Sequence, residues 1–246
     1  MQFLILSDLH ANWPALKAVI DDTAGQYEAI VCCGDVVGYN PQPGRVLEWV
    51  RACCNAVIRG NHDKVVAGID DIEWFNEVAQ TAARWTMDVL SEDQLAYLRS
   101  LQQGPASIDG FQIWHGSPVD EDEYLTAPGE AARCFSEMHG PLGFFGHTHL
   151  QGGFFAKHGY VGILPQVRFS EREYVLELEP DVTYMVNPGS VGQPRDRDPR
   201  AAYVLFDSSR KLVTFRRVPY SVAETVADIQ AAGLPDMLGL RLLAGF

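Results

Sequence analysis

The stretch Phe3-Leu4-Ile5-Leu6-Ser7-Asp8-Leu9-His10 decides the fold. Its first four residues form a short apolar run, and a polar cluster follows at once. An apolar run of this length, bounded by polar residues, is typical of a strand that is buried on both faces of a sheet. Alternate side chains of an extended segment point the same way, so Asp8 and His10 are expected to lie side by side. The sequence therefore predicts a buried strand that ends in two potential metal ligands.

The same arrangement recurs four times along the chain. Apolar runs at 29–33, 56–58, 111–114 and 143–145 each precede a polar cluster. Helical periodicity fills the gaps between the early runs, which favours a β-α-β-α beginning, and Asn12 is expected to cap the first helix. The four clusters are Gly34-Asp35, Arg59-Gly60-Asn61-His62-Asp63, His115-Gly116 and Gly146-His147-Thr148-His149.

The middle and the end of the chain follow other patterns. A period near 3.6 predicts one amphipathic helix over about 72–90, and Ser91-Glu92-Asp93-Gln94 resembles a capping box that starts another. Alternating stretches at 160–169, 174–178, 184–186, 202–206 and 212–218 predict mostly antiparallel strands, and Ser221 is expected to open a helix that ends at Gly233. No linker divides the chain, so we expect one domain over 1–246, with the helices at 64–103 as an elaboration within it.

Composition excludes several classes of function. The chain has 32 acidic and 19 basic residues, a net charge of -13 and no basic block, which argues against general nucleic-acid binding. The apolar opening at 3–6 has no preceding basic residue and is too short for a signal peptide or a membrane span, so we expect a cytoplasmic location without membrane association. Five cysteines lack the spacing of a disulfide framework or a zinc ribbon.

Histidines are concentrated in the polar clusters. A single histidine beside an apolar run is usually structural, but here five of the seven histidines follow predicted strands. Imidazole and carboxylate ligands together suit Mn²⁺, Fe, Zn²⁺ or Ni²⁺ better than Ca²⁺ or Mg²⁺. The candidates exceed the need of one ion, so the economical solution is two divalent ions about 3.5–4 Å apart, with a bridging carboxylate and a bridging water or hydroxide. The candidate ligands are Asp8, His10, Asp35, Asn61, His115, His147 and His149.

Taken in order, these clusters resemble the signature of the calcineurin-like metallophosphoesterase superfamily over nearly the whole chain. That signature consists of Asp-x-His, Gly-Asp, Gly-Asn-His-Asp/Glu, a lone His and Gly-His-x-His. The resemblance implies an α/β (α+β) fold, a four-layer αββα sandwich with a dinuclear metal site at the carboxyl ends of the central strands. The matching residues are Asp8/His10, Gly34-Asp35, Gly60-Asn61-His62-Asp63, His115 and Gly146-His147-Thr148-His149.

The resemblance also implies a role for each matched residue. Asp8, His10 and His149 would hold the first metal, and Asn61, His115 and His147 the second. Asp35 would bridge both ions, and His62 would contact the scissile phosphate and help the leaving group depart. The implied activity is hydrolysis of a phosphoester by a metal-bridging hydroxide, with Asp35 and His62 as the catalytic residues.

Two segments bear on the branch of the superfamily. The run Gly34-Asp35-Val36-Val37-Gly38-Tyr39 lacks the acid that orients the catalytic histidine in Ser/Thr protein phosphatases. Asp63 is the nearest substitute in the sequence, and a structural cap is the alternative role for it. The segment at 187–195 resembles small prokaryotic phosphodiesterases, which favours a small phosphodiester or phosphomonoester as substrate.

The sequence leaves alternative functions and substrate contacts open. If the segment around Trp74, Phe75 and Trp85 forms a lid, a nucleotide or dinucleoside polyphosphate hydrolase is an alternative, and a non-catalytic scaffold of the same fold is another. Candidate substrate contacts are Arg59, Tyr39 and Arg195, although Arg195 also suits a solvated loop of alternating charge. The sequence does not identify the substrate, the native metals or the oligomeric state.

Overall fold

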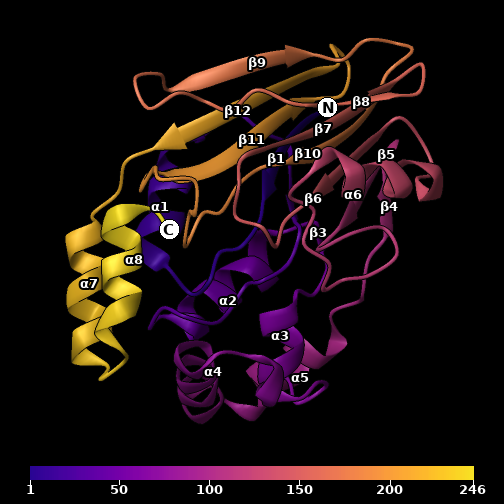
Figure 1. The fold of residues 1–246 in the computed structure, drawn as a ribbon. Helices are drawn as coiled ribbons and strands as arrows, with labels where there is room; N and C mark the ends of the chain where they lie inside the picture. The colour runs from indigo at the N-terminus through magenta and orange to yellow at the C-terminus, as the bar shows by residue number, and fades with distance from the viewer.

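Two stacked six-stranded sheets form the centre of the computed structural model, which describes residues 1–246 (Figure 1). The first sheet contains, in spatial order, β3 (Ala56–Val57), β2 (Ala29–Cys32), β1 (Gln2–Leu6), β11 (Ala201–Asp207), β12 (Leu212–Val218) and β9 (Glu173–Glu177). The second contains β4 (Ala106–Ile108), β5 (Phe111–Trp114), β6 (Leu142–Phe145), β10 (Thr183–Asn187), β7 (Gly152–Lys157) and β8 (Tyr160–Ile163).

Helices cover the outer faces of both sheets. They are α1 (Trp13–Asp22), α2 (Pro43–Cys53), α3 (Asn61–Val66), α4 (Glu77–Val89), α5 (Glu92–Ser100), α6 (Pro128–Cys134), α7 (Val222–Ala231) and α8 (Asp236–Ala244), with 3-10 turns η1 (Ile72–Trp74) and η2 (Phe135–Glu137). None combines the length and the apolar character that crossing a membrane requires.

Three packing layers produce the expected four-layer αββα sandwich. Aromatic rings fill the space between the sheets, where Phe3 meets Phe111 at 5.1 Å between ring centroids. Leu16 of α1 and Val46 of α2 pack on the outer face of the first sheet. Ala131 of α6 packs on the outer face of the second sheet. The fold class expected from the sequence is therefore confirmed.

Parallel pairing brings the ends of the ligand-bearing strands together. β1 pairs in parallel with β2, and β2 with β3. In the second sheet β6 pairs in parallel with both β5 and β10. The carboxyl ends of parallel strands meet at one edge of a sheet, so the loops that follow these strands converge.

The structure corrects two predicted boundaries. The helix expected over 72–90 is interrupted, because Phe75 is extended and the Asn76 side chain accepts the backbone N–H of Ala79 at 3.0 Å, capping α4. The strand expected over 160–169 ends at Ile163, shortly before Pro165, which has no N–H to donate to a ladder. The predicted cap of α1 is confirmed, since Asn12 accepts the N–H of Ala15 at 3.2 Å.

The segment at 64–103 shares a core with the first sheet. Ala83 of α4 and Leu98 of α5 belong to the same buried cluster as Leu4 and Leu6 of β1. A separate domain would bury its apolar residues in a core of its own. We therefore propose a single domain over 1–246 that includes these helices.

Candidate metal centre

An unusual backbone conformation marks the loops after the strands. Residues with a positive φ cost of the order of 1–3 kcal/mol each and gather at functional sites. Hydrogen bonds between the loops hold the strained segments, for example from Asp8 N to the Gly34 carbonyl and from His10 N to the Asp35 carbonyl, both at 3.0 Å. Five predicted ligands adopt such a φ: Asp8 (53°), His10 (44°), Asp35 (55°), His147 (65°) and His149 (60°).

These loops bring the seven predicted ligands together in two groups that share Asp35. Potential ligand atoms of Asp8, His10, Asp35 and His149 lie within 4.8 Å of one another, and so do those of Asp35, His115 and His147. The Asn61 Oδ1 atom lies 3.2 Å from Nε2 of His115 and so joins the second group. All the grouped carboxylates and imidazoles are buried.

Backbone carbonyls fix the tautomers in the first group. Nδ1 of His10 donates to the Val37 carbonyl at 3.0 Å, and Nδ1 of His149 donates to the Gln193 carbonyl at 2.5 Å. Burial lowers the pKa of both imidazoles well below the ordinary value, so both rings are neutral and each Nε2 keeps its lone pair. These two Nε2 atoms are only 3.0 Å apart. Two facing lone pairs repel, and a shared cation relieves the repulsion.

Backbone carbonyls also determine which ring nitrogen of each histidine is available in the second group. Nδ1 of His115 donates to the Cys33 carbonyl at 2.8 Å, which leaves Nε2 at 3.4 Å from Oδ2 of Asp35. Nε2 of His147 donates to the Asp122 carbonyl at 3.1 Å, which leaves Nδ1 available. Although burial opposes it, the Asp35 carboxylate raises the pKa of His115 to about 10, so a metal would compete with this proton for Nε2.

Two buried carboxylate oxygens indicate that these residues can bind metal ions. Oδ2 of Asp8 and Oδ2 of Asp35 are buried without a hydrogen-bond partner. Burial raises the pKa of Asp8 to about 7, and the nearby charge of Asp35 adds to the effect. Unpaired buried carboxylates are costly unless a cation compensates them. Orphaned carboxylate oxygens beside the neutral imidazoles of His10, His147 and His149 are a donor set that fits divalent transition metals.

His62 lies beside this cluster but belongs to neither ligand group. Its backbone N–H donates to Oδ1 of Asp35 at 2.9 Å. Its ring is held between the rings of Tyr39 and Phe75, each 4.4 Å away between centroids. Nδ1 is buried without a partner, and burial lowers the pKa of His62 to about 4. Aromatic packing, and not a carboxylate, orients this neutral ring.

Asp63 takes the capping role of its two possible roles. Its carboxylate accepts the N–H of Gly60 at 2.9 Å and the N–H of Val37 at 3.1 Å. The bond from Gly60 caps the first turn of α3, and the bond from Val37 joins α3 to the loop after β2. Asp63 therefore supports the backbone of the site and does not polarise the His62 ring.

The absence of a side chain at Gly38 makes room for the ring of His62. Gly38 has φ +95°, and a Cβ there would lie 2.5 Å from Nδ1 of His62. We expect Gly38→Ala to displace the ring and lower kcat by roughly 10²-fold, as small misplacements do, without loss of metal. Gly25→Ala is the matched control, because Gly25 also has a positive φ but nothing within 4 Å. Equal kcat values in the two variants would contradict the proposed placement of His62.

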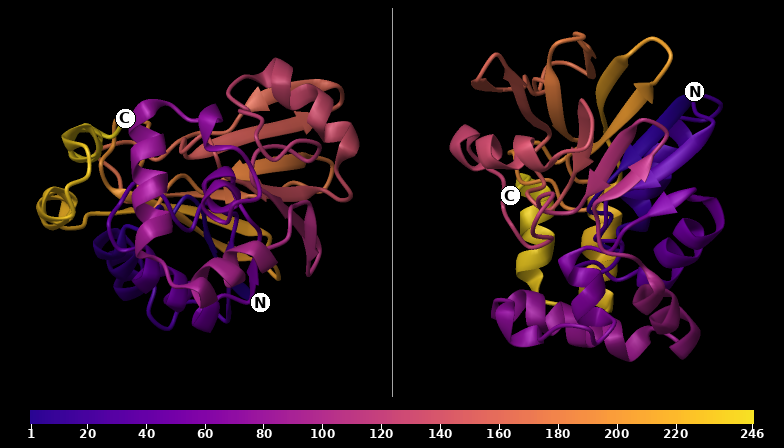
Figure 2. Two further views of the ribbon diagram at one scale, coloured as in Figure 1. Left: turned by 90° about the horizontal axis from the view of Figure 1, so that it is seen from below. Right: turned by 90° about the vertical axis from the view of Figure 1, so that its right-hand side faces the viewer.

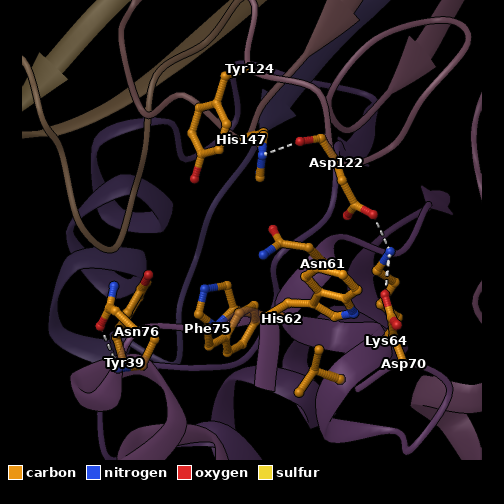
Figure 3. Close-up of a pocket in the computed structure, with 13 residues that line it drawn as sticks. Tyr39, Asn61, His62, Lys64, Asp70, Phe75, Asn76, Asp122, Tyr124 and His147 are labelled. Carbon is orange, nitrogen blue, oxygen red and sulfur yellow. Dashed lines mark hydrogen bonds and ion pairs between the residues drawn. The ribbon is translucent and has the colours of Figure 1, made fainter. Parts of the chain in front are cut away.

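An open cavity of about 350 Å³ adjoins the cluster (Figure 3). Asn61, His62 and His147 line it together with Tyr39, one of the expected substrate contacts. Arg195, another expected contact, donates to the Tyr39 hydroxyl at 3.2 Å, and its Nε has no partner. Tyr39 therefore faces the space where a substrate would bind, whereas Arg195 lies behind Tyr39 and does not line the cavity.

Two sequence expectations about this cavity do not match the structure. Arg59 does not line the cavity, and its Nε and one terminal nitrogen donate to Glu121, at 3.0 and 2.9 Å. Trp74 and Phe75 line the cavity, but Trp85 packs against the cluster formed with α7 and α8. Neither difference was visible in the sequence, since the partners are remote along the chain.

Sequence reasoning also missed several partners of the ligands. The carbonyls of Val37, Gln193, Cys33 and Asp122 carry no sequence signal, because every residue has a carbonyl group. Tyr124, whose ring centroid lies 3.9 Å from that of His147, was missed as well. Its position directly after the acidic run at 120–123 was the only available signal.

A four-layer sandwich with this cluster at its strand ends defines a metallophosphoesterase. The family model described as the calcineurin-like phosphoesterase superfamily domain matches residues 1–211. The chain belongs to this superfamily.

Comparison with individual proteins agrees with this assignment. The crystal structure of a metallophosphoesterase from Sphaerobacter thermophilus is 39% identical, with a TM-score of 0.86 over 100% of this chain and 99% of that chain. The uncharacterized protein MJ0912 of Methanocaldococcus jannaschii is 32% identical over 98% of this chain and 97% of its own length. A putative diadenosine tetraphosphatase, at 15% identity and a TM-score of 0.50 over 87% of this chain and 92% of that chain, shares the fold.

Proposed function

We propose that the protein is a dinuclear metal-dependent phosphoesterase that hydrolyses small phosphodiesters or phosphomonoesters. The observation that carries this proposal is the buried pair of ligand groups around Asp35, which opens onto a cavity lined by His62. Divalent ions bound there would supply Lewis acidity and a nucleophile, by lowering the pKa of a bound water to about 7. Mn²⁺, Fe, Zn²⁺ and Ni²⁺ suit the donor set.

Each residue has a proposed task in this site. Asp8, His10 and His149 hold one ion, and Asn61, His115 and His147 hold the other. Asp35 bridges the two, since it is common to both groups. His62 presents Nε2 to the substrate, because its Nδ1 is buried. A neutral ring with its proton on Nε2 can donate to the scissile phosphate or to the leaving oxygen.

Removal of metal is the direct test. We expect the purified protein to hydrolyse bis(p-nitrophenyl) phosphate in the presence of Mn²⁺, to lose activity in a chelator, and to regain it when Mn²⁺ is restored. The measurement is p-nitrophenolate release alongside metal content. Full activity after complete metal removal would contradict the proposal, and metal-loaded protein that hydrolyses no phosphoester would favour the scaffold alternative.

Arg195 is proposed to favour substrate binding through Tyr39, the residue of the cavity wall that it contacts. Its guanidinium carbon lies 5.9 Å from the centroid of the Tyr39 ring, and its positive charge attracts a phosphate across that ring. A hydrogen bond from a charged group contributes about 1.5–3 kcal/mol, so Arg195→Met should raise KM by roughly 10-fold or more. The exposed neighbour Arg197 provides the matched control Arg197→Met. An unchanged KM in Arg195→Met would remove this contact from the proposal.

The second candidate function is hydrolysis of nucleotides or dinucleoside polyphosphates. The observation that favours it is the presence of Trp74 and Phe75 in the cavity wall, where a nucleobase could stack. Hydrolysis of a panel of cyclic nucleotides, dinucleoside polyphosphates and phosphomonoesters distinguishes the two candidates.

A further inference from the structure

The wall of the cavity is rich in aromatic side chains. Four rings line it, from Tyr39, Trp74, Phe75 and Tyr124. Figure 3 shows Tyr124 and His147 across the cavity from Phe75 and His62. The volume of about 350 Å³ lies in the range of small-molecule sites. A planar group that enters this space would therefore meet rings on opposite sides.

Two of these four side chains are exposed enough to contact a ligand. Trp74 is 82% exposed and Tyr124 is 50% exposed, although both line the cavity. Tyr39 and Phe75, by contrast, are less exposed and pack on His62, and one face of the Tyr124 ring packs on His147. Stacking of a planar group on an available aromatic ring typically strengthens binding by roughly 10-fold.

The charges on this wall do not suit additional phosphates. Lys64 is the one cationic side chain that lines the cavity, and only 7% of its side chain is exposed. It pairs with Asp70 at 2.9 Å, with Glu121 at 3.5 Å, and with Asp122. Asp70 and Asp122 also line the cavity, so the wall has two negative charges against one positive charge. A second or third phosphate would meet carboxylates and no free cation.

The aromatic wall is supported from behind. Phe75 directly precedes α4, whose Ala79 and Ala82 pack with Tyr39 against Leu238 of the α7–α8 hairpin. Figure 2 shows this C-terminal hairpin beside the helices of the 64–103 segment. The hairpin lies beyond the residues 1–211 that the family model matches. Support of this kind keeps the wall in place before a ligand arrives, which lowers the entropy lost on binding.

We infer that the site selects phosphodiesters in which the group that stays on phosphorus carries an uncharged planar ring, and that it discriminates against polyphosphate chains. This inference rests on the proposed phosphoesterase function and narrows it to one substrate class. The phosphate binds at the metal ligands, and the ring that stays on phosphorus stacks on the exposed Trp74. Trp74 is a specificity-determining residue, and its exposure means that its replacement costs little stability.

The first test compares two substrates with the same leaving group, bis(p-nitrophenyl) phosphate and methyl p-nitrophenyl phosphate. Trp74→Ala should lower kcat/KM for the diaryl ester by roughly 10-fold, mainly through KM, and leave the methyl ester unchanged. Trp74→Phe should retain the wild-type values. Phe169→Ala is the control, because Phe169 is 72% exposed but does not line the cavity. An equal effect of Trp74→Ala on both esters, or no effect on either, would overturn the inference.

The second test concerns charge. Asp70→Asn removes one negative charge from the wall and should raise kcat/KM for diadenosine tetraphosphate while leaving methyl p-nitrophenyl phosphate unchanged. A wild-type preference for the tetraphosphate over thymidine 5′-(p-nitrophenyl phosphate) would overturn the discrimination. Failure of the proposed function looks different, because then wild type and variants alike hydrolyse no ester with any of the four metals.

Discussion

Asp35→Asn is expected to lower turnover by roughly 10⁴-fold, the scale of loss when one member of a catalytic unit is removed, and to weaken retention of both metals. Oδ2 of Asp35 lies 3.5 Å from Nε2 of His10 and 3.4 Å from Nε2 of His115, so it reaches both ligand groups. The amide keeps the shape of the side chain and can still accept the His62 N–H at Oδ1. What the variant loses is the negative charge between the two metal positions.

The measurement for Asp35→Asn is metal content per chain, taken together with kcat on bis(p-nitrophenyl) phosphate. Asp21→Asn on the exposed side of α1 is the control for the same chemical change away from the cluster. Wild-type turnover with two ions bound in Asp35→Asn would refute the bridging role. Loss of a single ion would reassign Asp35 to one of the two groups.

His62→Ala is expected to lower kcat by about 10²–10³-fold, the usual cost of removing one hydrogen-bond donor to the transition state, while metal content stays at the wild-type value. The reason is geometric. The ring lines the cavity and packs between Tyr39 and Phe75, but it is not among the grouped ligand atoms. Removing it should therefore affect the chemistry and not the metals.

The His62→Ala experiment also separates an enzyme from a scaffold. The control is His139→Ala, since His139 is exposed and remote from the cavity. Circular dichroism checks that the cavity left between Tyr39 and Phe75 does not unfold the segment. If kcat in His62→Ala equals that of His139→Ala, His62 has no part in the reaction, and loss of metal would place it among the ligands instead.

Local sequence patterns were sufficient to predict most of the strands and helices. Strand β5 was predicted at its observed bounds, and β1 and β2 to within one residue, because short buried runs and their polar ends are local signals. The interruption at Phe75 was missed, since the period of 3.6 continues across it. The Asn76 side chain caps α4 and so separates this helix from the preceding turn. The spacing of apolar residues gives no sign of such a cap.

The number of donor residues was already sufficient to expect two metal ions, and the resemblance to the superfamily implied which residues would hold each. Asp8 and Asp35 follow strands of the first sheet, whereas His147 follows β6 of the second. Only the tertiary structure shows how individual side chains are paired and oriented. Arg59 is neutralised by Glu121, 62 positions away, and His149 is oriented by the Gln193 carbonyl, 44 positions away. Such partners meet only when distant loops close on each other, so no local spacing in the chain encodes them.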